Sequence, residues 1–208
     1  MTGIRIKLCG VRRPEDAALC EEAGADEIGV IFARHSRRCV TTDTAREIRA
    51  VVPPEVVLVG VFQDATLDEA VRIADEVGLT ALQFHGALPS KRHARLRMYA
   101  ALQIEGEAAL ERVAGASGFH RVLLDGPSGG SGASFAWSLA RRARPLFQGE
   151  LFIGGGLTPD NVAAAIHAAA PDGVDVASGI EGPDGFKDPA RVRAFVAAVR
   201  AVGPQEPA

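Results

Sequence analysis

Short hydrophobic runs alternate with longer stretches of helical periodicity along almost the whole chain. The short runs are rich in β-branched and aromatic residues and predict strands at residues 4–9, 27–32, 56–62, 81–85, 98–103, 122–125, 151–153 and 174–177. The longer stretches predict helices, one beginning at Pro14 and the others at residues 42–50, 67–77, 89–96, 107–115, 135–147, 159–170 and 189–202. This strict alternation predicts a parallel sheet, because each helix returns the chain to the end where the next strand begins.

The number of strand–helix units narrows the fold class. A chain of 208 residues is long enough for one sizeable core but short for two domains. Eight units in this length favour a closed (β/α)8 TIM barrel over the alternative, a doubly wound open sheet. We therefore predict a single α/β domain over residues 1–202 and a polar, frayed tail over residues 203–208.

Charge and cysteine usage limit the possible partners. Lysine and arginine number 23 against 26 acidic residues, a net charge of −3, so no basic excess is present to neutralise a nucleic acid. The three cysteines, Cys9, Cys20 and Cys39, lack the spacing of metal ligands. No N-terminal apolar run resembles a signal peptide or a membrane span. We expect a cytoplasmic protein with no bound metal and no nucleic-acid or membrane partner.

Strand parity predicts which side chains face the interior of the barrel. Successive strand residues point to opposite faces, and on the first strand the hydrophobic parity of Ile4, Ile6 and Leu8 suits contact with the helices. The opposite parity of this and later strands predicts an inward set of Lys7, Cys9, Gln83, His85, Asp125 and Asp175. Barrel enzymes place their chemistry at the C-terminal ends of the strands, where Cys9, His85 and Asp125 fall.

The deeper members of the inward set have a structural interpretation. Closure of the barrel makes the first and eighth strands neighbours, so Lys7 and Asp175 are expected within about 4 Å of each other, because an unpaired buried charge is costly. We interpret them as an inner pair that supports the cavity. His85 is expected to shape the cavity floor through hydrogen bonds, although the usual pKa of histidine suits proton transfer.

Two glycine-containing loops predict an anion site. The seventh strand is followed by Gly154-Gly155-Gly156-Leu157-Thr158-Pro159, in which Thr158 is a suitable N-cap and Pro159 a suitable first helical residue. The eighth strand is followed by Ser178-Gly179. Loops at these two places often bind phosphate in this fold. The loops after strands three and four contain no comparable cluster, so we expect one phosphate, held by Gly155, Gly156, Ser178 and Gly179.

The motifs together resemble one enzyme family over nearly the whole chain. Those that carry the resemblance are Lys7-Leu8-Cys9-Gly10, Ser36-Arg37-Arg38, Val59-Gly60-Val61-Phe62, Gln83-Phe84-His85-Gly86, Leu123-Leu124-Asp125, Gly129-Gly130-Ser131-Gly132, Phe135-Ala136-Trp137, Gly155-Gly156-Leu157 and Asp175 through Ser178-Gly179. In order and spacing they resemble phosphoribosylanthranilate isomerase. The resemblance implies a cofactor-free Amadori rearrangement of a phosphosugar, N-(5-phosphoribosyl)anthranilate, in tryptophan biosynthesis.

The resemblance also implies residue roles. Asp125 would be the general acid that protonates the furanose ring oxygen, which requires a pKa raised by desolvation. Cys9 would be the general base at C2, with the charge of Lys7 favouring the thiolate. Arg38 would bind the anthranilate carboxylate; a solvated place in the basic run around it is the alternative.

Other functional interpretations stay open at this point. The family pattern commonly has an acid at the position of Ala87, a lysine at Ala133 and an acid at Ala136, which gives weight to a noncatalytic phosphosugar-binding barrel. A related sugar-phosphate isomerase of histidine biosynthesis is a further alternative. Its substrate has two phosphates and it uses an aspartate at the end of strand one, so Cys9 and the missing second glycine loop argue against it. The sequence is compatible with a monomer or a homodimer.

Overall fold

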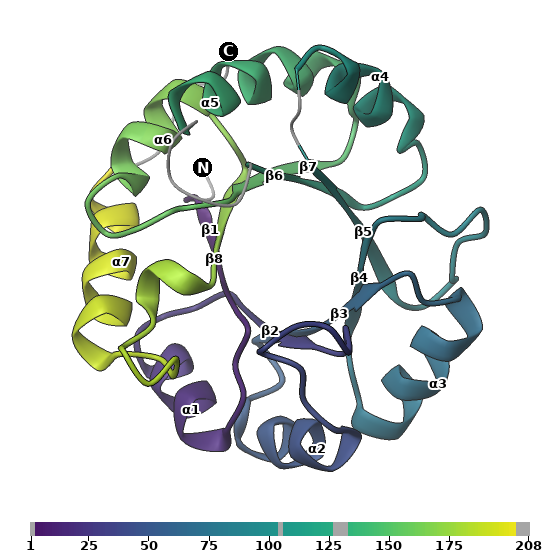
Figure 1. Cartoon of the computed structure of the whole chain (residues 1–208), viewed down its shortest axis with the longest axis vertical. Helices are drawn as coiled ribbons and strands as arrows, with labels where there is room; N and C mark the ends of the chain where they lie inside the picture. The colour runs from purple at the N-terminus through teal and green to yellow at the C-terminus, as the bar shows by residue number, and fades with distance from the viewer. Residues whose placement is uncertain (1–2, 104–105, 127–132, 203–208) are drawn as a thin grey trace.

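The chain folds into a closed eight-stranded parallel barrel surrounded by helices (Figure 1). The computed structural model describes residues 3–103, 106–126 and 133–202; the predicted tail at 203–208 and the Gly129 to Gly132 motif lie outside them. The strands are β1 (Arg5–Cys9), β2 (Glu27–Ile31), β3 (Val57–Gln63), β4 (Ala81–His85), β5 (Arg97–Gln103), β6 (Arg121–Asp125), β7 (Glu150–Gly154) and β8 (Gly173–Val176). Each strand pairs with the next in sequence, and β1 closes the barrel on β8. The predicted fold class is confirmed.

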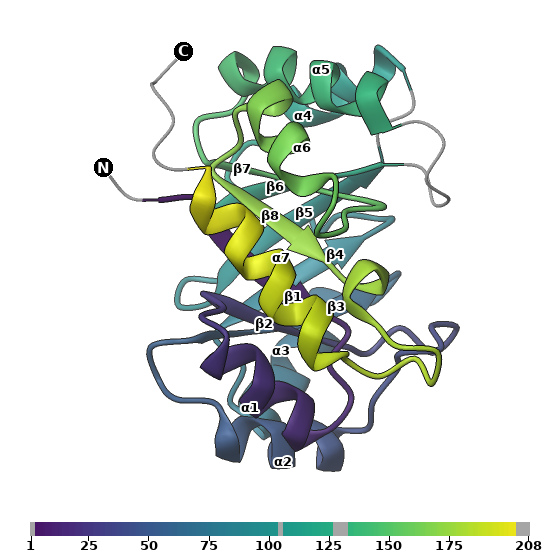
Figure 2. The same cartoon turned by 90° about the vertical axis from the view of Figure 1, so that its left-hand side faces the viewer.

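The helices form the outer ring. They are α1 (Pro14–Glu22), α2 (Thr42–Val51), α3 (Leu67–Val77), α4 (Ala108–Gly115), α5 (Ala133–Ala143), α6 (Val162–Ala169) and α7 (Pro189–Ala201), with short 3-10 helices at η1 (Arg144–Leu146) and η2 (Ser178–Ile180). Helices α1 to α6 lie in connections between strands, and α7 follows β8. Figure 2 shows α7 lying across β8 and β1, the two strands that close the barrel. No helix within the described residues is long and apolar enough to cross a membrane.

One predicted helix is absent. Residues 89–96, between β4 and β5, form bends without a helical segment. Side chains take up the backbone groups there: the Arg92 guanidinium donates to the Pro89 carbonyl at 2.5 Å, and His93 Nδ1 accepts from the Arg95 amide at 3.3 Å and the Leu96 amide at 3.1 Å. Such local bonds compete with the helical pattern, and the helix prediction at 89–96 was wrong.

The start of α6 also differs from the prediction. The helix begins at Val162, with Asn161 as its N-cap, and not at Pro159 after a Thr158 cap. The Thr158 amide donates to Asn161 Oδ1 at 2.8 Å, and Asn161 Nδ2 donates to the Gly156 carbonyl at 2.9 Å. The asparagine therefore ties the glycine loop to the start of the helix, because one amide side chain both accepts and donates.

The predicted strand parity is confirmed. Ile4, Ile6 and Leu8 are buried in the main core, which lies between the strands and the helical ring. Cys9 instead packs inside the barrel, in a separate cluster with Val59, Val61, Ala81 and Tyr99. The two faces of β1 thus have different neighbours, as the period of two requires.

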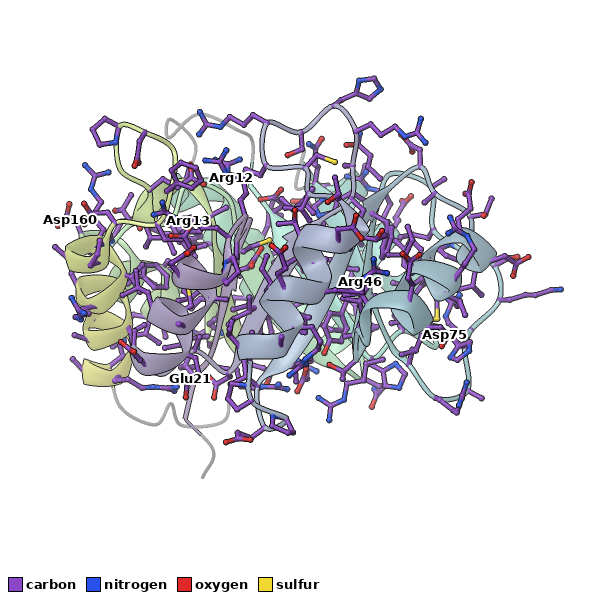
Figure 3. The ribbon with its side chains drawn as sticks, turned by 90° about the horizontal axis from the view of Figure 1, so that it is seen from below. Arg12, Arg13, Glu21, Arg46, Asp75 and Asp160 are labelled. Carbon is purple, nitrogen blue, oxygen red and sulfur yellow. The ribbon has the colours of Figure 1, made fainter. Side chains whose placement is uncertain are left out.

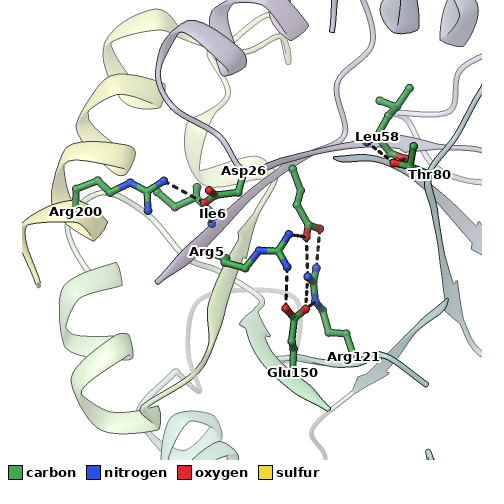
Figure 4. Close-up of polar contacts among 9 residues, drawn as sticks. Arg5, Ile6, Asp26, Leu58, Thr80, Arg121, Glu150 and Arg200 are labelled. Atoms are coloured by element: carbon green, nitrogen blue, oxygen red, sulfur yellow. Dashed lines mark hydrogen bonds and ion pairs between the residues drawn. The ribbon is translucent and has the colours of Figure 1, made fainter. Parts of the chain in front are cut away.

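The opposite end of the barrel from the cavity is filled by a charged cluster (Figure 4). Arg121 donates to both carboxylate oxygens of Glu27 at 2.6 Å and to Glu150 at 2.6 Å. Arg5 bridges the same two carboxylates at 2.6 and 2.7 Å. The Arg121 guanidinium carbon also lies 4.0 Å from the ring centroid of Tyr99 and 3.5 Å from that of Phe152. Two cations and two carboxylates balance in charge, which offsets the desolvation of the buried Arg121.

Removal of Arg121 is expected to destabilise the barrel strongly. The Arg121→Met variant leaves Glu27, which is fully buried, with Arg5 as its remaining cation in this cluster. Breaking a buried ion pair from one side costs about 3–5 kcal/mol, to be measured by urea unfolding. The matched control is Arg142→Met, which breaks an exposed bidentate pair with Glu107 and should have a small effect. Equal losses in the two variants would contradict this account.

Candidate active site

A cavity of about 550 Å³ lies at the C-terminal ends of the strands. It collects most of the residues that the sequence predicts for the site: Cys9, Arg38, His85, Asp125, Gly155, Gly156, Asp175 and Ser178. Figure 3 shows Arg12 and Arg13 at the upper end of α1 and Glu21 at its lower end. Lys7 and Gly179 do not line the cavity but lie next to residues that do.

Lys7 and Asp175 form the expected inner pair. Lys7 Nζ lies 2.8 Å from Asp175 Oδ1, and the lysine side chain is 1% exposed. Burial opposes the lysine charge, but the charges of Asp175 and Cys9 outweigh it and raise the pKa of Lys7. The lysine is therefore a permanent cation beneath the cavity floor.

Asp125 has a carboxyl that is protonated far more readily than an ordinary one. It is the last residue of β6 and lines the cavity. Desolvation, followed by the negative charge of Asp175, raises its pKa from 3.8 to about 6, while Lys7 opposes the rise. A pKa this close to neutral suits a general acid, because both protonation states are populated near physiological pH.

Cys9 lies against Lys7 because strand β2 has no side chain at Gly29. A Cβ on Gly29 would come within 2.7 Å of Cys9 Sγ and 3.2 Å of Lys7 Nζ. Burial nevertheless raises the pKa of the Cys9 thiol, and the lowering by Lys7 is smaller. Lys7 lowers the thiol pKa and so favours the thiolate, as expected, but desolvation raises that pKa by more. A raised pKa favours the thiol over the thiolate at neutral pH.

His85 is a neutral imidazole in the cavity wall. Burial, followed by the charge of Lys7, lowers its pKa to about 4. Its Nε2 lies 2.9 Å from Nε2 of Gln83 on the same strand, so the uncharged ring accepts the amide hydrogen. These contacts agree with a cavity-shaping role and do not place a charge at this position.

The glycines of the loops after β7 and β8 allow close backbone approaches. Gly155 and Gly156 have φ values of +81° and +68°, and a Cβ on Gly155 would come within 2.3 Å of the Gly126 amide nitrogen. A Cβ on Gly179 would lie 1.9 Å from the Leu157 carbonyl oxygen. The loops after β6, β7 and β8 are therefore in backbone contact, which larger residues would prevent.

Arg38 reaches the cavity from the loop after β2. Its aliphatic stem lies on Gly10, where a Cβ would be 2.5 Å from Arg38 Cδ. The guanidinium donates to Glu181, with Nε 2.5 Å from Oε1 and Nη2 2.9 Å from Oε2. Arg38 is thus half-buried and held by Glu181, so it is not a solvated member of the basic run around it.

Sequence reasoning did not find Glu181 or Lys187. Both are buried, and Lys187 Nζ donates at 3.0 Å to the carbonyl of Ala177, a cavity-lining residue just after the end of β8. A signal was present: the chain has only the lysines Lys7, Lys91 and Lys187, and the first and last are buried at the site. Lysine is rare in this arginine-rich chain, and a lysine that is buried requires a partner for its charge.

Comparisons with known proteins agree with this architecture. A family model described as N-(5'phosphoribosyl)anthranilate (PRA) isomerase matches residues 6–198. N-(5'-phosphoribosyl)anthranilate isomerase of Pseudomonas aeruginosa strain UCBPP-PA14 is 44% identical, in an alignment that covers 96% of this chain and 97% of that protein. The protein of the same name from Pseudomonas fluorescens strain Pf0-1 is 43% identical, with 96% and 100% covered.

Solved structures give the same result. Phosphoribosyl anthranilate isomerase from Thermotoga maritima superposes with a TM-score of 0.86 at 33% identity, covering 95% of this chain and 99% of that one. A phosphoribosyl anthranilate isomerase crystallised with reduced 1-(o-carboxyphenylamino)-1-deoxyribulose 5-phosphate has a TM-score of 0.84 at 32% identity, with the same shares covered. Sequence and fold thus agree over nearly the full length, and this chain belongs to the N-(5'-phosphoribosyl)anthranilate isomerase family of enzymes.

Proposed function

We propose that this enzyme converts N-(5-phosphoribosyl)anthranilate to 1-(2-carboxyphenylamino)-1-deoxyribulose 5-phosphate, an Amadori rearrangement in tryptophan biosynthesis, without a cofactor. The observation that carries the proposal is the shared cavity of Asp125 and Cys9, with the glycine loops at its rim. One proton donor and one proton acceptor are what the rearrangement requires. Family membership supplies the substrate class.

The phosphate is anchored by the loops after β7 and β8. Gly155, Gly156 and Ser178 line the cavity, and Gly179 allows these loops to pack together. Backbone amides freed by a left-handed glycine turn and by a helix start are suited to an anion. The related enzyme crystallised with a reduced product carries one phosphate on its ligand, which supports the expectation of a single phosphate.

Asp125 opens the ribose ring. Its protonated carboxyl donates to the furanose oxygen as the bond from that oxygen to C1 breaks, and the anilino nitrogen stabilises the resulting iminium ion. The raised pKa of about 6 keeps a proton available near neutral pH. After transfer, the carboxylate is stabilised by the positive charges of Lys7 and the new iminium ion.

Cys9 removes the proton from C2. The electrons of that C–H bond form a C1–C2 double bond and neutralise the iminium, giving an enolamine. This tautomerises to the ketone as C1 gains a proton and the C2 hydroxyl loses one. The thiol must first ionise, because only the thiolate is a competent base. The iminium charge acts with Lys7 against the desolvation that raises the thiol pKa, so ring opening prepares the base for the second step.

Arg38 receives the anthranilate carboxylate and sets the direction of the substrate. The phosphate loops follow β7 and β8, whereas Arg38 follows β2, so the two anionic groups of the substrate are held from different loops of the mouth. Two-point binding places C1 and C2 between Asp125 and Cys9. Positioning of this kind contributes several kcal/mol to a rate.

The decisive experiment is turnover by the purified protein. The anthranilate fluorescence of the substrate is expected to fall when the protein is added, because the rearrangement changes the fluorophore. The protein is also expected to restore growth without tryptophan to a bacterium that lacks only this isomerase. A well-folded protein that binds a product analogue but fails both tests would be a binding-only barrel.

A further inference from the structure

The Arg38 guanidinium is held from behind by a buried carboxylate that belongs to a different loop. Glu181, in the connection between β8 and α7, has a side chain that is 3% exposed. It binds Arg38 in a bidentate manner, through Nε at 2.5 Å and Nη2 at 2.9 Å. Bidentate pairs fix the plane as well as the position of a guanidinium.

Glu181 is itself rigidly placed. Its amide donates to the Ser178 carbonyl at 3.1 Å, and its carbonyl accepts from Arg191 at 2.7 Å. An antiparallel bridge joins it to Lys187, whose Nζ lies 3.4 Å from Glu181 Oε1. These contacts hold Glu181 independently of Arg38, so its carboxylate can set the geometry of the arginine.

The geometry leaves one edge of the guanidinium free. Nη1 of Arg38 makes no hydrogen bond with residues 3–103, 106–126 or 137–202, and Arg38 lines the cavity. A guanidinium can serve one carboxylate through Nε and Nη2 and a second through Nη1 and the remaining hydrogen of Nη2. Arg37 also reaches Glu181 at 3.0 Å, so three cations surround one carboxylate and the cluster keeps an excess positive charge.

We propose that Glu181 is the positioning residue for the carboxylate end of the substrate: it holds Arg38 so that the free Nη1 edge faces the cavity and receives a ligand carboxylate. The inference rests on the proposed function for the identity of that ligand. It does not require turnover, because the positioning acts on binding.

Binding of two matched ligands tests the proposal. The first is reduced 1-(o-carboxyphenylamino)-1-deoxyribulose 5-phosphate, and the second is the same compound without its carboxylate. Glu181→Gln is expected to weaken binding of the first about 10- to 100-fold, the range found when a residue that orients a metal ligand is lost, and to change binding of the second by less than about threefold. With active enzyme, KM should rise more than kcat falls.

A double-mutant comparison separates positioning from an independent contribution. In an Arg38→Met background, Glu181→Gln should change binding of the first ligand by no more than about twofold, because the group it orients is gone. Glu181→Asp keeps the charge of the cluster but shortens the reach, so it should show the same selective loss even if Glu181→Gln folds poorly. Glu107→Gln, in the exposed pair with Arg142, is the matched control.

Several results would overturn the proposal. If Glu181→Gln weakened binding of both ligands equally, Glu181 would be a general support of the loop. If Glu181→Gln and Glu181→Asp both left binding of the carboxylated ligand unchanged, Arg38 would not depend on Glu181. If the losses of binding caused by Glu181→Gln and Arg38→Met were additive in the double mutant, Glu181 would likewise not act through Arg38. Wild-type protein that binds the carboxylated ligand selectively but does not turn over substrate would reject the proposed function and leave this inference intact.

Discussion

Replacement of Asp125 by asparagine is expected to lower turnover by about 10²- to 10⁴-fold, the usual contribution of a positioned proton-transfer group. Asparagine keeps the size of the side chain but cannot release a proton to the ring oxygen. Affinity for a product analogue should change much less, because the group acts on the reacting bond. Steady-state kinetics and ligand titration measure the two effects. Asp68→Asn, an exposed carboxyl on α3, is the control, and near-normal turnover of Asp125→Asn would reject the acid role.

The same substitution is expected to stabilise the fold above neutral pH. The native pKa of Asp125 is about 6, against 3.8 for an ordinary aspartate, so the native state holds its proton to higher pH than the unfolded chain. The contribution of Asp125 to wild-type stability therefore falls as pH rises from about 4 through 6, by about 2–3 kcal/mol in total. Asparagine does not ionise, so its gain should be present at pH 7.5 and absent below pH 4 in urea unfolding. A gain independent of pH would contradict the desolvation account.

Replacement of Cys9 by alanine is expected to reduce turnover to a similar extent, about 10²- to 10⁴-fold. Alanine fits the interior cluster of Cys9 with Val59, Val61 and Tyr99 but has no base. Cys9→Ser should also be poor, since a hydroxyl is a far weaker base than a thiolate at neutral pH. The kinetics are compared with Cys39→Ala, whose cysteine is exposed. Wild-type rates in Cys9→Ala would assign the base to another group.

The direction of the Cys9 pKa gives this second prediction a pH signature. Because burial raises the thiol pKa, alkylation of the unliganded enzyme by iodoacetamide should be slow at neutral pH and accelerate as pH rises through that elevated value. A fast reaction at pH 7 would mean that Lys7 outweighs desolvation. The Cys9→Ala variant gives the background from the other two cysteines.

The sequence determined the barrel and most of the inward-facing set. Strand side chains alternate with a period of two, and eight sequential parallel strands close in only one neighbour order, so parity and order alone placed Lys7 against Asp175 and Cys9 in the same cavity as Asp125. The glycine content of the loops was also readable from the sequence, but the close contacts of Gly155 with Gly126 and of Gly179 with Leu157 were decided by the fold. The roles of these residues in catalysis stay predictions.

The tertiary structure decided what depends on distant partners. The segment at 89–96 lost its helix to side-chain bonds, one of them from Arg92 to the Ser117 carbonyl. Glu181 meets Arg38 across 143 positions of sequence, a pairing that no local pattern encodes. The pKa of Cys9 depends on the balance between burial and nearby charges. Periodicity determines which face of the strand a residue lies on. Contacts between distant residues and the pKa values of buried groups depend on all their neighbours in space, and only the closed barrel brings those neighbours together.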